Sequence, residues 1–113
     1  MEPIEINAGS WYLRALRADE RVDDRPALRE GGIEDTDYVA ERSRQWAGDE
    51  HYSWAVCEPT TGELLAEVGL TPNGSECVVD GWARPGHDDA LAAALEAAQR
   101  FAAGALGLAL AER

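Results

Sequence analysis

The apolar positions along the chain recur at two spacings, one typical of strands and one typical of helices. Residues 11–16 form an aromatic and partly alternating run that predicts a strand. Residues 4–6 alternate isoleucine with glutamate, which fits either a short edge strand or an ordered tail. The charged segment 17–29 predicts a short helix, which Asp19 can cap and within which Pro26 introduces a break or a turn.

A second helix is predicted after the stop signal of Gly31-Gly32. Either Asp35 or Thr36 can cap this helix, which extends to Trp46 because its larger residues recur at helical spacing. Its arginines, Arg42 among them, are expected on the outer face of the helix.

The middle of the chain predicts two consecutive hairpins. The turn 59–62 joins a strand at 54–57 to a strand at 63–70, and the turn 71–75 leads on to a strand at 78–84. Together these strands form an antiparallel meander.

An alanine-rich helix then begins at His87-Asp88-Asp89 and runs to Leu106, and residues 108–111 predict a last strand. This strand and the strand at 78–84 flank the helix as a βαβ unit and should lie parallel. The helix carries an apolar stripe that faces the core, formed by Leu91, Leu95, Ala98, Phe101, Ala102 and Ala105. The predicted order is therefore β-α-α-β-β-β-α-β, a mixed α+β sheet in one domain spanning residues 1–113.

Charge narrows the choice of partners. Acidic residues number 22 against 10 basic ones, a net charge of −12, and every basic residue is an arginine. Duplex nucleic acid is therefore not expected as a partner, because phosphate binding needs clustered basic side chains. The acidic surface is either simply solvated or attracts a basic partner. Without a membrane span or secretory segment, a cytoplasmic protein is expected, and the Ala, Arg, Gly and Asp usage is typical of GC-rich bacteria.

Several local motifs together resemble one family across nearly the whole chain. The motifs are Trp11-Tyr12-Leu13-Arg14-Ala15-Leu16, the hairpin residues 54–56, 61–65 and 68–70, the strand end Trp82-Ala83-Arg84-Pro85, and Phe101 with Leu106-Gly107-Leu108. They are similar to the GNAT superfamily of acetyl-CoA-dependent N-acetyltransferases, and most of all to its ribosomal-protein alanine acetyltransferase branch. The resemblance implies an acyl-CoA N-acyltransferase fold.

The resemblance also implies where a cofactor would bind. The family's loop has the form Arg/Gln-x-x-Gly-x-Gly/Ala and holds the diphosphate of coenzyme A on backbone amides. The matching positions here are Trp82, Ala83, Arg84, Gly86, His87, Asp88 and Asp89. A carboxylate ~5 Å from a phosphate repels it by roughly 1–2 kcal/mol, whereas the same aspartates in a first helical turn stabilise the helix by about 0.5–2 kcal/mol. We therefore expect a degenerate loop and no cofactor, with acetyl-CoA used only if the protein is active.

Other candidates for chemistry are few. Glu67 and Asp80 lie on neighbouring predicted strands and could act as a general base toward an amine, although outward-facing carboxylates are the expected alternative. His51 and His87 are expected to be exposed, and no metal site is expected. Cys57 and Cys77 are expected as buried reduced thiols that could face each other across the sheet. The tryptophans, expected in the core or alternatively in a binding groove, are Trp11, Trp46, Trp54 and Trp82.

The chain ends at Arg113, where members of the resembled family continue with a helix and two further strands. This shortening would leave the last strand with an unpaired edge, which a second copy of the chain could cover. The function expected is a dimeric, non-catalytic binding or accessory protein. The alternatives are an N-acetyltransferase with an atypical cofactor site, and an acidic inhibitor that mimics the ligand of a basic partner.

Overall fold

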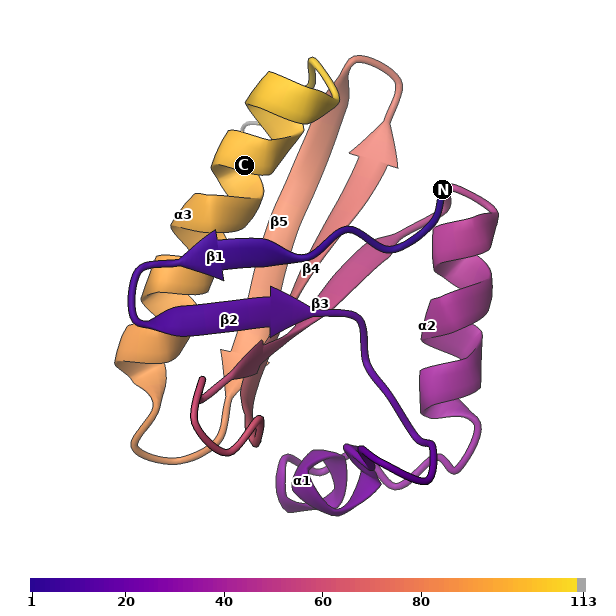
Figure 1. Cartoon of the computed structure of the whole chain (residues 1–113). Helices are drawn as coiled ribbons and strands as arrows, with labels where there is room; N and C mark the ends of the chain where they lie inside the picture. Colours follow the sequence, from indigo (N-terminus) through magenta and orange to yellow (C-terminus); the bar gives the residue numbers. More distant parts are fainter. Residues whose placement is uncertain (112–113) are drawn as a thin grey trace.

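The strands follow one another across a single sheet in chain order. The computed structural model describes residues 1–111, and its six-stranded sheet has the order β1-β2-β3-β4-β5-β6. Figure 1 labels the first five of these strands. Each neighbouring pair is antiparallel except β5 and β6, which are parallel. The elements are β1 (Ile6–Ala8), β2 (Trp11–Arg14), α1 (Arg25–Glu30), α2 (Tyr38–Ala47), β3 (Tyr52–Cys57), β4 (Leu64–Asn73), β5 (Glu76–Ala83), α3 (Asp88–Ala105) and β6 (Ala109–Leu110).

The mixed α+β sheet with its meander and βαβ unit is confirmed, and one strand is added to the predicted order. β1 pairs with β2 through the tight turn at Gly9-Ser10, and Gly9 has the positive φ of 62° that such a turn requires. The edge strand or tail was predicted at residues 4–6, whereas the observed strand covers Ile6–Ala8. The two ranges share only Ile6. Glu112 and Arg113, at the end of the predicted domain, lie outside the described residues.

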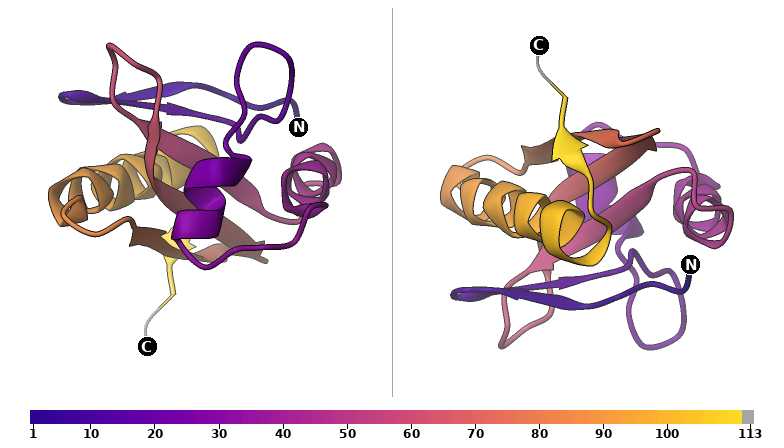
Figure 2. Two further views of the ribbon diagram at one scale, coloured as in Figure 1. Left: turned by 90° about the horizontal axis from the view of Figure 1, so that it is seen from below. Right: turned by 90° about the horizontal axis from the view of Figure 1, so that it is seen from above.

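Helices cover both faces of the sheet (Figure 2). α3 packs one face with five buried alanines, which lie against residues such as Leu13, Trp54 and Val68. α1 and the start of α2 cover the other face, where Leu28 belongs to the same cluster as Ala55. Because both faces are covered, the first seven residues of β4 are all buried. Of the predicted α3 stripe, Ala105 is exposed.

α2 also takes the place of a strand beside the first half of β3. β2 pairs with β3 only over Ala55–Cys57. Alongside the remaining half, the indole nitrogen of Trp46 donates a hydrogen bond to the carbonyl oxygen of Ser53 at 2.9 Å. The Trp46 ring also packs edge-on against Trp54, with centroids 5.2 Å apart. The helix is thereby fixed against the sheet.

The first two helices begin later than predicted. Asp19 caps no helix, because its carboxylate accepts the backbone N–H groups of Arg21 and Val22 within a turn. α1 begins at Arg25, and Pro26 lies in its first turn, where a missing N–H carries no penalty. α2 begins at Tyr38.

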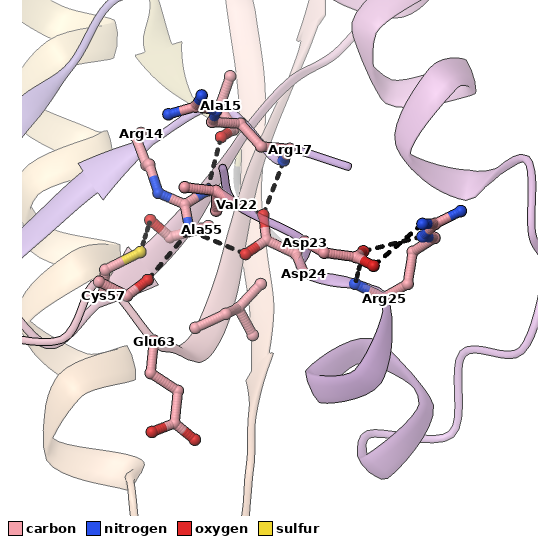
Figure 3. A network of polar contacts seen from close by, with 12 residues as sticks. Arg14, Ala15, Arg17, Val22, Asp23, Asp24, Arg25, Ala55, Cys57 and Glu63 are labelled. Atoms are coloured by element: carbon pink, nitrogen blue, oxygen red, sulfur yellow. Dashed lines mark hydrogen bonds and ion pairs between the residues drawn. The ribbon is translucent and has the colours of Figure 1, made fainter. Parts of the chain in front are cut away.

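A buried ion pair joins the first helix to the sheet (Figure 3). The guanidinium of Arg14 donates two hydrogen bonds of 2.8 Å to the carboxylate of Asp24, and two more to the carbonyl oxygens of Ala15 and Gly62. Asp24 also accepts the backbone N–H of Arg17 at 2.7 Å. The pair therefore holds together β2, the start of α1 and the turn between β3 and β4.

Both cysteines are free and buried, as predicted, but they do not face each other. Cys57 belongs to the core on the α1 side, whereas Cys77 belongs to the core on the α3 side. β4 also separates their strands. Burial raises the pKa of the Cys57 thiol to about 11, which keeps it protonated at neutral pH. None of the helices within residues 1–111 combines the length and hydropathy needed to cross a bilayer.

Candidate functional site

Glu67 is the one acidic residue of β4, and its side chain faces α2. Only 3% of the residue is exposed, so the expectation of an outward-facing carboxylate is wrong for this position. The hydroxyl of Tyr38 donates to it at 2.7 Å, and the indole nitrogen of Trp82 donates at 3.0 Å. The helix that covers this face of the sheet therefore supplies part of the carboxylate's surroundings.

Arg42 supplies the opposite charge from the same helix. Its Nε lies 3.3 Å from Oε2 of Glu67, and its Nη2 donates to the hydroxyl of Tyr38 at 2.8 Å. Arg42 and Tyr38 are one helical turn apart, and the guanidinium lies 4.8 Å from the centre of the Tyr38 ring. Arg42 is therefore turned inward, not onto the outer face of the helix.

The protonation of this cluster follows from its burial. Burial raises the pKa of Glu67, and the hydrogen bond from Tyr38 and the charge of Arg42 oppose that rise. Burial and then the nearby charge of Glu67 raise the pKa of Tyr38 well above its ordinary value, so its hydroxyl keeps its proton and acts as a donor. Since Trp82 is also a donor, Glu67 serves as the common acceptor.

His51 lies over Gly69, the next residue on the same face of β4 as Glu67. A Cβ atom at position 69 would lie 2.6 Å from the His51 ring, so the position requires glycine. Nδ1 of His51 is 2.9 Å from the hydroxyl of Thr71. Burial, with the charge of Arg42 adding to it and Asp80 opposing, lowers the pKa of His51 to about 4. The ring is thus neutral at pH 7 and half-buried, not exposed as predicted.

These side chains enclose a small cavity of about 50 Å³, here called the Gly69 cavity. Its lining residues are Arg42, His51, Glu67, Gly69, Asp80, Gly81 and Trp82. Asp80 pairs with Gly69 across β4 and β5, and it is exposed. The fold therefore brings the two predicted general-base candidates, Glu67 and Asp80, to one cavity, with one buried and one at its rim.

The predicted cofactor corner, residues 82–89, is built differently. Arg84 forms ion pairs with Glu30 and Glu63, so its charge is already matched. Asp88 and Asp89 form the first turn of α3, after His87 at the N-cap position. Both aspartates lie in the first helical turn, as predicted, and add negative charge at the N-terminus of the helix.

Two of the backbone amides in this corner are also occupied. Asp89 accepts the N–H of Ala90 at 2.9 Å, and the N–H of His87 donates to the carbonyl of Arg84 at 3.1 Å. A diphosphate needs open amides and positive charge. The residues present, Ala83 and Gly86 included, do not fit coenzyme A bound in that way.

A larger groove runs beside β5. β6 pairs only with Glu76 and Cys77, so the rest of β5 has no strand on that side within the described residues. The resulting groove has a volume of about 410 Å³ and is lined by β5, by Leu95 and Gln99 of α3, and by Leu110 and Ala111. Asp80 and Gly81 line both this groove and the Gly69 cavity.

Solved structures whose names describe acetyltransferases share the fold of this chain. A protein of Vibrio cholerae, provisionally assigned as a ribosomal-protein-serine acetyltransferase, superposes with a TM-score of 0.77 over 96% of this chain and 72% of its own, at 18% identity. An acetyltransferase from Agrobacterium tumefaciens str. C58 gives 0.67 over 93% and 70%, at 18% identity. A third protein, named a probable acetyltransferase, gives 0.71 over 93% and 70%, at 13% identity.

The chain has the GNAT acetyltransferase fold. No protein-family model matches the sequence, and no curated relative matches it significantly. The chain spans 70–72% of the length of those solved chains. Within that fold, α3 begins at the corner where the sequence resemblance implies a cofactor loop.

Proposed function

We propose that this chain is a GNAT-fold binding protein that does not transfer acetyl groups, and that it works as a homodimer. The start of α3 is the observation that carries the first part. Asp88 and Asp89 bring two negative charges to it, Arg84 is matched by Glu30 and Glu63, and the amide of Ala90 is occupied. Each of these features opposes a bound diphosphate.

Titration calorimetry with acetyl-CoA tests this part. The wild-type chain is expected to give no binding heat at ligand concentrations up to about 1 mM. The double variant Asp88→Gly with Asp89→Gly is the matched control, because it removes both charges and leaves the rest of the chain unchanged. Loss of two repulsions of roughly 1–2 kcal/mol each should tighten binding by about 30- to 800-fold. Micromolar binding to the wild-type chain would overturn the proposal.

The dimer is proposed to form through the β6 edge of the sheet. Its support is the exposure of Val78 and Leu110, at 37% and 46%, beside a strand only two residues long. Exposed apolar side chains at an open strand edge favour pairing with another strand. Light scattering of the wild-type chain at about 50 µM should give a molar mass twice that of one chain. The Leu110→Asp variant should give the mass of a single chain. A wild-type monomer at that concentration contradicts the dimer.

A working N-acetyltransferase is the second candidate, and one observation favours it. The groove beside β5 and the Gly69 cavity meet at Asp80 and Gly81. An acyl donor in the groove would therefore approach an amine near Glu67, a buried carboxylate with a raised pKa. The same titration decides between the two candidates, because transfer requires the donor to bind.

A further inference from the structure

Unpaired polar atoms gather at the Gly69 cavity. Three buried side-chain nitrogen or oxygen atoms within residues 1–111 have no hydrogen-bond partner, namely Nε of Arg42, Nε2 of His51 and Oγ of Ser53. The first two belong to residues that line the cavity, and Ser53 is paired with Gly69 across β3 and β4. Buried polar groups without partners are uncommon in folded proteins, so the two that belong to lining residues, on Arg42 and His51, indicate an occupant of the cavity.

The size of the cavity limits what the occupant can be. Its volume is about 50 Å³, and one water needs about 10–15 Å³ on such a measure. The space therefore suits about three or four non-hydrogen atoms, which is a terminal group and not a whole metabolite. Because Asp80 and Gly81 also line the groove beside β5, the rest of a ligand can extend in that direction.

The unpaired atoms define the chemistry of that group. Nε of Arg42 is always a donor, so the group must carry an acceptor. Nε2 of His51 is a donor if Nδ1 accepts from Thr71, and an acceptor if Nδ1 donates to Thr71. The exposed carboxylate of Asp80 at the rim is an acceptor that a donor on the group can reach. A group with both an acceptor oxygen and N–H donors satisfies these atoms with either form of His51.

We propose that the Gly69 cavity binds a terminal primary carboxamide, of the kind that ends a glutamine or asparagine side chain. Its oxygen accepts from Nε of Arg42, and its NH₂ group donates to Asp80 at the rim. An ammonium group would leave Nε of Arg42 with only its 3.3 Å approach to Glu67, and would add positive charge beside the guanidinium. A carboxylate would add negative charge beside Glu67 and Asp80 and offers no donor. The inference rests on the proposed binding role and names the ligand class for it.

Three small probes of similar size separate these possibilities. Propionamide, propionate and propylammonium are titrated into the ¹⁵N-labelled chain at pH 7, and the indole N–H of Trp82 and the ring of His51 are followed by NMR. Propionamide is expected to shift both signals with millimolar affinity, since so few atoms bind weakly. The other two probes should bind at least about tenfold more weakly.

Two variants test the assignment to this cavity. Arg42→Lys keeps the charge and removes the Nε donor, and Gly69→Ala moves a methyl group to within 2.6 Å of the His51 ring. Both should lose the propionamide response by about tenfold or more. Arg44→Lys, the same substitution on an exposed position of α2, should leave it unchanged. The indole signal of the buried Trp54 reports whether each variant is folded.

Two results would overturn the inference. One is that propylammonium or propionate shifts the Trp82 and His51 signals at lower concentration than propionamide does. The other is that no probe shifts them, which would mean that the cavity holds ordered water only. The probe titration contains no acetyl-CoA, so its outcome is independent of the calorimetry described above. If the calorimetry detected acetyl-CoA binding, the proposed function would fail, but a propionamide response at the Gly69 cavity would still stand.

Discussion

Two carboxylates of this chain, Asp24 and Glu67, are almost fully buried beside an arginine, and their surroundings differ. Arg14 meets Asp24 through two parallel hydrogen bonds, and the surrounding backbone pairs with both side chains (Figure 3). Arg42 meets Glu67 only through Nε at 3.3 Å, without hydrogen-bond geometry. A cavity adjoins the second pair.

The comparison separates a structural role from a binding role. A buried charge is costly unless hydrogen bonds satisfy it. The Arg14 pair is satisfied by the chain itself, so it acts as an internal brace and leaves nothing for a ligand. The Arg42 pair keeps an unmet donor beside open space, so part of its hydrogen bonding is left for another molecule. Completeness of pairing, more than burial, distinguishes the two regions.

Breaking the braced pair should have the largest effect. Arg14→Met leaves Asp24 buried without its partner, and the free energy of unfolding should fall by about 3–5 kcal/mol. Urea denaturation measures the change, and Arg25→Met, at an exposed ion pair, is the control, in which the free energy of unfolding should change far less. An equal loss in the two variants would remove the distinction between a brace and a surface contact.

Neutralising Glu67 should lower the free energy of unfolding by less than Arg14→Met does. In Glu67→Gln the amide oxygen can still accept from Tyr38 and Trp82, and Arg42 is 23% exposed and can be partly solvated. We expect a loss of about 1–2 kcal/mol in the same denaturation experiment. A loss as large as that of Arg14→Met would mean that this pair is also a brace, and would weaken the case for a binding site.

The smallest expected effect is a dependence of stability on pH. The pKa of His51 falls from its ordinary 6.5 to about 4 in the folded chain, so unfolding takes up a proton between these values. Stability from this group is therefore present above about pH 6.5 and is lost as pH falls toward 4. Because the ring is partly exposed, the loss should be only about 1 kcal/mol.

Thermal unfolding across this pH range measures the effect, and His51→Gln should flatten the profile. Glu67 acts in the opposite direction, since its raised pKa makes the folded chain less stable as pH rises above 4.5. The double variant His51→Gln with Glu67→Gln should lack both trends. An unchanged profile in His51→Gln would show that the ring is not held neutral by the cavity.

The elements of the second half of the chain were predictable because glycine and proline mark their ends. The turn at 59–62 was correctly predicted, whereas the turn predicted at 71–75 is only Gly74-Ser75, because β4 continues to Asn73 and pairs with β5 over that length. Pro85-Gly86 lies between β5 and α3. β1 was harder, because its three residues carry too short a pattern. The late start of α1 was also hidden, since Asp24 owes its position to Arg14, ten residues earlier.

The site itself was only partly predictable. Glu67 and Asp80 were identified by their neighbouring strands, yet both carboxylates were expected to face water. Glu67 is buried because α2 covers that face, and no local pattern states which face a helix will cover. Tyr38 and Arg42, one turn apart, are the available signal, since an inward arginine needs a buried partner.

The indole of Trp46 links two properties of the molecule that are usually separate. It seals the part of β3 that β2 leaves uncovered, and it belongs to the same helix as Arg42 and Tyr38. A loosened α2 would open the Gly69 cavity. It would also expose the unpaired half of β3, to which strands of other chains could bind. Loss of recognition and loss of solubility should therefore arise together in this protein.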